Sequence, residues 1–404
     1  MDRNLYRNIW NEFASYRQMV FITGPRQSGK TTFTEIIAKD YANSLYFNWD
    51  IIDNKSKLIQ NPSFYEDVYR KDDSLPLIIL DEIHKYKEWK NYLKSVYDRD
   101  SKNFKFIVSG SGRLDIYQKG GDSLAGRYFL FHLFPLTLAE LSRANQEVGD
   151  FLHNPIKIGD ENREADELWQ NLAQFSGFPD PYIQGKQTFY RAWSRTYQKQ
   201  LLREDIRDIT SLRNITTVEL LFSLIPSKIG SPLSMGNIAT DLHVSFDSVK
   251  NWLNILEQFY LLFRITPWSK KISRAITKEK KIYLYDFARI ETEGAKFENM
   301  VAVELWRAVS HWNDLGVGEF TLHYVRNRDK EEIDFLIANK NNPFLLIETK
   351  LSDHTPSKVM RKFQSHLSIP AVQLINKPGI CKVISNGDNK ILIISAPRWL
   401  AMLP

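Results

Sequence analysis

The sequence is poor in several features that define large classes of proteins. Its 404 residues include one cysteine, Cys381, which excludes an internal disulfide and a cysteine-based metal cluster and suits a reducing compartment. No apolar run reaches the roughly 18 residues of a membrane-spanning helix, and the first residues lack the apolar core of a signal peptide. These absences predict a cytoplasmic protein with no membrane partner.

A large excess of charge of one sign is also missing. The chain has 54 Lys and Arg against 48 Asp and Glu, which gives a formal net charge of +6. The basic residues gather locally, because the stretch from Arg264 to Lys281 holds seven of them and one acid. Such a strip suits DNA or another polyanion, although a solvated linker can have the same composition.

The most informative stretch that is present fits the phosphate-binding pattern G-x-x-x-x-G-K-[ST]. An apolar run precedes it and a helix-compatible run follows, which is the strand–loop–helix context of a P-loop. The two glycines allow the backbone to turn its N–H groups toward an anion, and the lysine supplies charge for the outer phosphates. We expect the following residues to bind ATP: Gly24, Pro25, Arg26, Gln27, Ser28, Gly29, Lys30, Thr31 and Thr32.

A second motif follows about fifty residues later, where the apolar run Leu75 to Leu80 ends in two adjacent carboxylates, Asp81 and Glu82. A continuous apolar run predicts a strand buried on both faces of a parallel sheet. Asp81 would hold Mg²⁺ together with the Thr31 hydroxyl, and Glu82 would polarise the water that attacks the γ-phosphate. Lys30, Asp81 and Glu82 therefore predict a site that hydrolyses ATP.

The next apolar run, Phe104 to Val108, leads into Ser109-Gly110-Ser111. A hydroxyl at this strand end would lie beside the γ-phosphate, and we select Ser111 as the candidate; an ordinary serine–glycine turn remains the alternative. Alternating strands and helices after a P-loop predict a doubly wound α/β domain that binds its ligand at the carboxyl ends of the strands.

Taken together, Gly24 to Thr31, Asp81-Glu82, Ser109 to Ser111 and Leu124-Ala-Gly126-Arg127 resemble a clade of AAA-superfamily ATPases whose members carry a C-terminal domain of unknown function 4143. The resemblance implies ATP and Mg²⁺ as cofactors. It also implies an arginine that completes the ATP site of a neighbouring subunit, for which Arg127 is the first candidate and Arg113 the second. A homo-oligomer would follow from such an arginine, and a structural surface arginine is the alternative.

The length and the 43% hydrophobic content predict two or three folded domains. We expect an AAA-type P-loop domain with a parallel sheet over residues 1–142. Residues 143–268 should form a linker, polar up to about residue 168, and then a helical, winged-helix-like region. The resemblance places a smaller, restriction-endonuclease-like α/β domain over residues 269–404.

Within the winged-helix-like region, three helical segments are followed by a short strand. The last of these helices would present Ser245, Ser248, Lys250 and Asn251 to DNA. It has one lysine and no arginine, however, and phosphate contacts need basic side chains. Packing or protein contact is therefore an open alternative to DNA binding.

The last third contains a second group of charged residues, Asp334, Glu348 and Lys350, with Glu298 on a preceding helical segment. This group resembles the PD-(D/E)xK core of restriction endonucleases. Glu348 and Lys350 lie two apart on one predicted strand and so share a face. The carboxylates could bind Mg²⁺, and the lysine could help to activate a water for phosphodiester cleavage. Exposed strand-end charges, or an inactive nuclease fold, explain the same residues.

Two hypotheses follow. In the first, an ATPase of the AAA type couples Mg²⁺-dependent ATP hydrolysis to a DNA-binding C-terminal module, with nuclease activity open. In the second, the protein is a nucleotide-controlled switch or assembly factor, and its nuclease-like domain is an inactive scaffold that binds protein.

Overall fold

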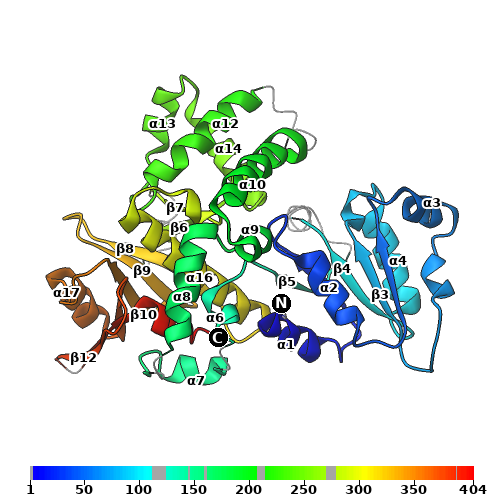
Figure 1. Cartoon of the computed structure of the whole chain (residues 1–404), viewed down its shortest axis with the longest axis horizontal. Helices are drawn as coiled ribbons and strands as arrows, with labels where there is room; N and C mark the ends of the chain where they lie inside the picture. The colour runs from blue at the N-terminus through cyan, green and yellow to red at the C-terminus, as the bar shows by residue number, and fades with distance from the viewer. Residues whose placement is uncertain are drawn as a thin grey trace. The chain divides into compact units, whose positions relative to one another are not determined.

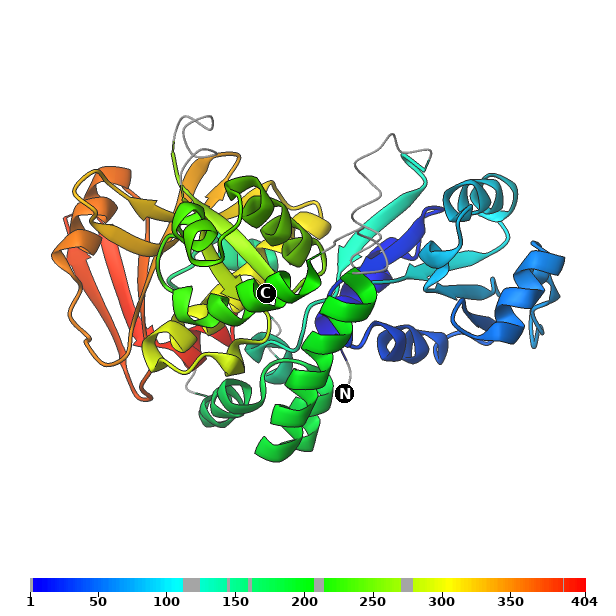
Figure 2. The same ribbon diagram turned by 90° about the horizontal axis from the view of Figure 1, so that it is seen from above.

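The computed structural model of the chain describes residues 3–111, 124–143, 146–158, 162–206, 214–269, 279–387 and 389–404. The chain divides into two compact units, which Figures 1 and 2 show from two directions. The first unit contains Met1–Pro135 with Gln258–Tyr260, and the second contains Leu136–Glu257 with Leu261–Pro404. No helix among the described residues is long and apolar enough to cross a membrane.

The first unit is built on a five-stranded sheet with the order β2-β3-β4-β1-β5, in which all neighbours are parallel. Its strands are β1 (Met19–Thr23), β2 (Ser44–Asn48), β3 (Leu77–Asp81), β4 (Lys105–Ser109) and β5 (Tyr128–His132). Its helices are α1 (Asn4–Phe13), α2 (Lys30–Ala38), α3 (Ile52–Gln60) and α4 (Trp89–Asp100), with short 3₁₀ turns at Phe64–Asp67 and Ile83–Lys85. The predicted parallel P-loop sheet is therefore confirmed.

The strand order explains why distant motifs meet. β4 lies between β1 and β3, and Ser109 is in register with Ile22 on one side and with Asp81 on the other. Because parallel strands all end at the same edge, the residues that follow β1, β3 and β4 come together there. Every residue of β1 and β3 is buried, as their continuous apolar sequences predict.

The second unit contains a mixed eight-stranded sheet with the order β12-β13-β11-β10-β9-β8-β6-β7. Its strands are β6 (Leu262–Pro267), β7 (Lys281–Leu284), β8 (Phe320–Arg326), β9 (Glu332–Asn339), β10 (Asn342–Lys350), β11 (Ala371–Ile375), β12 (Cys381–Asn386) and β13 (Asn389–Ser395). Within it, β8, β9 and β10 form an antiparallel meander.

Most helices of the second unit precede the first strand of this sheet in the chain, and α16, α17 and α18 follow it. They are α6 (Leu138–Leu141), α7 (Val148–His153), α8 (Arg163–Phe175), α9 (Pro179–Gln184), α10 (Gln187–Gln200), the π-helix η4 (Leu201–Asp205), α12 (Ile215–Leu224), α13 (Met235–Asp241), α14 (Phe246–Gln258), α16 (Glu293–Asp314), α17 (Lys358–Leu367) and α18 (Ala396–Leu400), with 3₁₀ turns at Ile225–Lys228 and Phe287–Arg289. The succession α12, α13, α14, β6 and β7 gives three helices followed by an antiparallel pair of strands, as in a winged helix.

The structure differs from two expectations: that a linker begins at residue 143, and that a domain boundary follows residue 268. The polar segment after residue 142 contains α7, whose Phe151 is buried with its ring 5.4 Å from that of Trp312. The boundary proposed after residue 268 falls between β6 and β7, which pair with each other within the larger sheet. A single buried aromatic residue among charges is a weak pattern, and the pairing of β6 with β7 leaves no local trace in the sequence.

Candidate functional site

The P-loop backbone depends on its two glycines. Gly24 has a φ of +142°, and a Cβ atom at this position would lie 2.2 Å from the carbonyl oxygen of Leu133. Gly29 has a φ of +91° in the left-handed region and immediately precedes α2. A side chain at either position would therefore strain or displace the loop, which explains the residue type that the motif requires.

Lys30 begins α2, and its ammonium group lies among the loop carbonyls. Its Nζ atom donates to the carbonyl oxygens of Gly24, at 3.1 Å, and Pro25, at 2.6 Å, and the residue is 7% exposed. The amino end of α2 adds the positive end of the helix dipole at the same place. The arrangement gives an anion such as a phosphate both a cation and a set of backbone donors.

Asp81 lies at the end of β3 and is 2% exposed. Its Oδ2 atom accepts a hydrogen bond of 2.8 Å from the Thr31 hydroxyl, and its Oδ1 atom accepts one of 2.7 Å from the Ser109 hydroxyl. A carboxylate and a hydroxyl in contact are oxygen ligands of the kind that Mg²⁺ uses beside nucleotide phosphates, where water supplies further ligands. Thr31 and Asp81 therefore fit the predicted ion.

Two contacts of Asp81 were not predicted. Tyr46 on β2 donates a hydrogen bond of 2.8 Å from its hydroxyl to Asp81 Oδ2. Burial and the Asp81 charge raise the pKa of Tyr46, so its hydroxyl keeps the proton that it donates. Ser109, and not the predicted Ser111, holds the other carboxylate oxygen, while the half-buried Ser111 lies two residues beyond the strand end. A role for Ser111 stays a prediction.

Glu82 follows Asp81 with a left-handed φ of +56°. Its Oε2 atom lies 3.0 Å from the Lys85 ammonium and 3.6 Å from His84 Nε2. Lys85 also pairs with Asp50 at 2.5 Å, and although its own burial acts in the opposite direction, these two carboxylates raise the pKa of Lys85. Glu82, whose carboxylate we expect to polarise water, is thus paired with the Lys85 ammonium.

Arg127 immediately precedes β5, and its carbonyl oxygen accepts the amide of Met19 at the beginning of β1. It therefore lies at the opposite edge of the sheet from the P-loop, so it cannot serve its own ATP site. Its Nε atom lies 2.8 Å from Asp98 Oδ1, and its side chain is 26% exposed. Arg113, the second candidate, lies outside the described residues.

In the winged-helix-like region, Lys250 and Asn251 on α14 are exposed. The Ser245 hydroxyl accepts a hydrogen bond of 3.1 Å from the amide of Ser248, which caps the beginning of the helix. Three of the four predicted contact residues, Ser245, Lys250 and Asn251, are thus exposed, and Ser245 and Ser248 together form the cap. Half of the basic strip, residues 270–278, lies outside the described residues.

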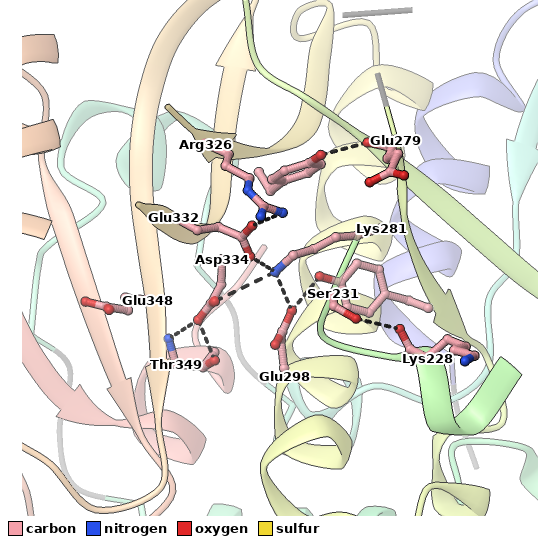
Figure 3. Close-up of polar contacts among 12 residues, drawn as sticks. Lys228, Ser231, Glu279, Lys281, Glu298, Arg326, Glu332, Asp334, Glu348 and Thr349 are labelled. Atoms are coloured by element: carbon pink, nitrogen blue, oxygen red, sulfur yellow. Dashed lines mark hydrogen bonds and ion pairs between the residues drawn. The ribbon is translucent and has the colours of Figure 1, made fainter. Parts of the chain in front are cut away.

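The charged group in the last third of the chain has an unpredicted member, Lys281, at the beginning of β7 (Figure 3). Its fully buried ammonium lies 3.0 Å from Glu298 Oε1 and 2.7 Å from Glu332 Oε1. Asp334 Oδ1 is 3.9 Å away. Burial acts against the lysine charge, but the three carboxylates prevail and raise the pKa of Lys281. A protein cation thus lies between the acids that were expected to hold a metal ion.

The other predicted members make separate contacts. Lys350 Nζ lies 2.9 Å from Glu348 Oε1, and Asp334 Oδ2 accepts hydrogen bonds from both the amide and the hydroxyl of Thr349, at 2.8 and 2.7 Å. Among the described residues, no group of three His, Cys, Asp or Glu side chains could hold a metal ion. The structure therefore brings Glu298 and Asp334 together around Lys281, and it pairs Glu348 with Lys350.

The segment before α13 covers this group of charges. Gly230 has a φ of +86°, and a Cβ atom there would lie 3.2 Å from Glu298 Oε2. The amide of Leu233 donates to the Lys280 carbonyl oxygen at 2.8 Å, and Pro232 forms a β-bridge with Lys281. The Lys281 contacts therefore join β7 and the winged-helix-like region to α16 and β9.

Three family models match the chain in succession. Residues 16–142 match a model described as an AAA domain, residues 166–290 a domain of unknown function 8612, and residues 293–395 a domain of unknown function 4143. The chain carries an AAA domain and a domain of unknown function 4143. The AAA domain includes every strand of the five-stranded sheet, and the sequence resemblance is confirmed in both parts.

Relatives span most of the chain at low identity. An uncharacterized protein of Mycobacterium tuberculosis is 21% identical over 372 residues, which are 88% of this chain and 76% of that protein. An uncharacterized protein of Methanocaldococcus jannaschii is 22% identical over 408 residues, with 94% of this chain and 86% of that protein covered. A solved structure of a Walker-type ATPase of Pyrococcus abyssi has a TM-score of 0.43 and 13% identity, and covers 71% of this chain and 94% of its own.

Proposed function

We propose that the AAA domain binds ATP with Mg²⁺ and hydrolyses it. The observation that carries this proposal is the hydrogen bond from Thr31, the residue after Lys30, to Asp81, which unites the two motifs about fifty residues apart. The loop amides and Lys30 would bind the phosphates, and Thr31 and Asp81 would hold the ion. Bound Mg²⁺ would neutralise charge on the β- and γ-phosphate oxygens.

Glu82 is the residue that we assign to the attacking water. Its carboxylate lies at the carboxyl edge of the sheet, directly after Asp81, but pairs with Lys85. In this account Glu82 exchanges Lys85 for water when ATP is bound. Arg127 would stabilise the transferring phosphate of a neighbouring subunit, because its place at the far edge of the sheet suits a site on another copy.

We further propose that the second unit binds DNA through its winged-helix-like region and that ATP hydrolysis is coupled to this binding. The exposed Lys250 and Asn251 on α14 support the proposal, together with the basic residues that the sequence places between Arg264 and Lys281. The test is the ATPase rate with and without duplex DNA at low salt, in the wild type and in Lys30→Ala. The proposal predicts a rate that changes with DNA in the wild type and is lost in the variant. No change with any nucleic acid, and no gel retardation at low salt, would refute DNA coupling.

A second candidate function is favoured by one observation. The Lys281 ammonium already occupies the space between Glu298, Glu332 and Asp334, so the restriction-endonuclease-like part would act as a scaffold that does not cut DNA. The discriminating experiment is DNA cleavage with Mg²⁺ or Mn²⁺. Cleavage that disappears in Asp334→Ala and in Lys350→Ala would establish a nuclease, and no cleavage by the wild type would favour the scaffold.

A further inference from the structure

Arg3, which precedes α1, makes contacts that neither motif predicts. Its guanidinium group is almost completely buried, with the residue 5% exposed. Nη1 donates to the carbonyl oxygen of Ser28 at 2.8 Å, and Nη2 donates to the carbonyl oxygen of Phe134 at 2.7 Å. The Arg3 Cζ atom lies 5.0 Å from the centre of the Tyr6 ring. One side chain thus joins the P-loop to the segment that follows β5.

The contact with Ser28 bears directly on phosphate binding. A trans peptide is planar, so its carbonyl oxygen and the following N–H point in opposite directions. By holding the Ser28 carbonyl oxygen, Arg3 also fixes the direction of the Gly29 N–H, which belongs to the set of P-loop donors. Gly29 has the backbone freedom to adopt other conformations, with its φ of +91°, so an external restraint on this peptide has an effect.

The hydrogen bond from Arg3 to Phe134 lies close to the end of the first unit. The Phe134 amide donates to the Tyr6 hydroxyl at 3.2 Å, and the Leu133 amide donates to the Thr23 carbonyl oxygen at 2.8 Å. The carbonyl oxygen of Leu133 also fills the space beside Gly24. The segment therefore touches the beginning of the P-loop and, through Arg3, its end. One residue later, at Pro135, the first unit ends and the chain enters the second.

We infer that Arg3 is a positioning residue of the ATP site, which holds the Ser28–Gly29 peptide for phosphate binding and couples the P-loop to the segment at the end of the first unit. The inference rests on the proposed ATPase function and names a residue that controls it. A guanidinium group has diverging donors that reach two carbonyl oxygens at once, whereas a lysine ammonium is a point charge. Arg3→Lys therefore keeps the charge and loses the bridge.

The first test compares Arg3→Lys and Arg3→Met with Arg7→Met. Arg7 lies on α1, four residues after Arg3, and pairs with Asp40 at the surface, so its variant is a matched control. We expect the dissociation constant of a fluorescent ATP analogue to rise about tenfold in both Arg3 variants, from the loss of charge-assisted hydrogen bonds, and to stay unchanged in the control. The KM for ATP should rise more than kcat falls. The unfolding temperature without nucleotide shows that each variant is folded.

A second measurement addresses coupling. In the wild type, ATP should slow amide hydrogen exchange both in the P-loop and in residues 133–136, and in Arg3→Lys only the P-loop should respond. Wild-type nucleotide affinity in the Arg3 variants would overturn the positioning role. If these variants also unfolded at a lower temperature, Arg3 would have a purely structural role. Failure of the wild type to bind ATP would instead refute the proposed function, so the two outcomes are distinguishable.

Discussion

At the scale of single residues, Asp81 is held from three sides. Thr31 and Tyr46 donate to one of its carboxylate oxygens, and Ser109 donates to the other. Each donor comes from a different element, so the orientation of the carboxylate depends on α2, β2 and β4 together. Hydrogen bonds to a carboxylate typically contribute about 1.5–3 kcal/mol, so each donor should influence how well Asp81 binds an ion.

Tyr46→Phe removes one of these donors and leaves the ring. We predict that the Mg²⁺ concentration for half-maximal ATP hydrolysis rises about fivefold or more, because the carboxylate loses an orienting hydrogen bond worth roughly 1 kcal/mol or more. A magnesium titration of the ATPase rate measures this. Tyr69→Phe is the control, since Tyr69 is 79% exposed. An identical titration curve for Tyr46→Phe would remove Tyr46 from the site.

Glu304 on α16 predicts a pH dependence of stability. Its Oε1 atom accepts the Leu138 amide, and burial raises its pKa from 4.5 to about 7. Between these values the folded chain binds a proton that the unfolded chain releases. The stabilisation is therefore complete below pH 4.5 and is lost as the pH rises through 7, by on the order of 3 kcal/mol.

Glu304→Gln is neutral at every pH and should lose this dependence. We expect its free energy of unfolding, from urea titrations, to fall less between pH 5 and pH 8 than that of the wild type, by roughly the same amount. Glu319→Gln removes an exposed carboxyl and serves as the control. Parallel pH curves for the wild type and Glu304→Gln would contradict the assignment.

At the scale of elements, the buried Lys281 connects β7 to α16 and β9 by contacts with half-buried carboxylates. Lys281→Met should destabilise the second unit by about 3–5 kcal/mol, because removal of the buried cation leaves half-buried carboxylates unpaired. The free energy of unfolding in urea measures this loss. Lys362→Met, which breaks the exposed pair with Glu331, should change stability by less than about 1 kcal/mol. If both variants lost the same small amount, the Lys281 contacts would not hold these elements together.

The elements that the sequence predicts well are those with a continuous local pattern. The apolar run before Asp81 and the glycine spacing of the P-loop each specify their structure within a few residues. Tyr46, Ser109 and Lys281 depend on which strands become neighbours, and no local pattern carries that information. The sequence located both strand-end serines, but only the register of β4 between β1 and β3 distinguishes Ser109 from Ser111.

At the scale of the whole molecule, an AAA domain is joined to a second unit with a winged-helix-like region and a large mixed sheet. If the second unit binds DNA through phosphates, affinity should fall steeply with salt, because each neutralised phosphate releases counterions. Lys250→Ala should weaken DNA binding and reduce the slope of log affinity against log salt by about 1. Lys362→Ala, far along the chain on α17, is the charge-matched control. Equal slopes in the wild type and Lys250→Ala would place DNA, if bound, elsewhere.

We propose that Asp81, Glu82 and the P-loop together form an ATP-hydrolysing site that responds to DNA. The most direct measurement is the rate of phosphate release with Mg²⁺, with and without duplex DNA at low salt, in the wild type and in Glu82→Gln. We expect a DNA-dependent rate in the wild type, and we expect Glu82→Gln to bind ATP without hydrolysing it. Turnover by Glu82→Gln at the wild-type rate, or a wild-type rate that DNA leaves unchanged, would contradict this proposal.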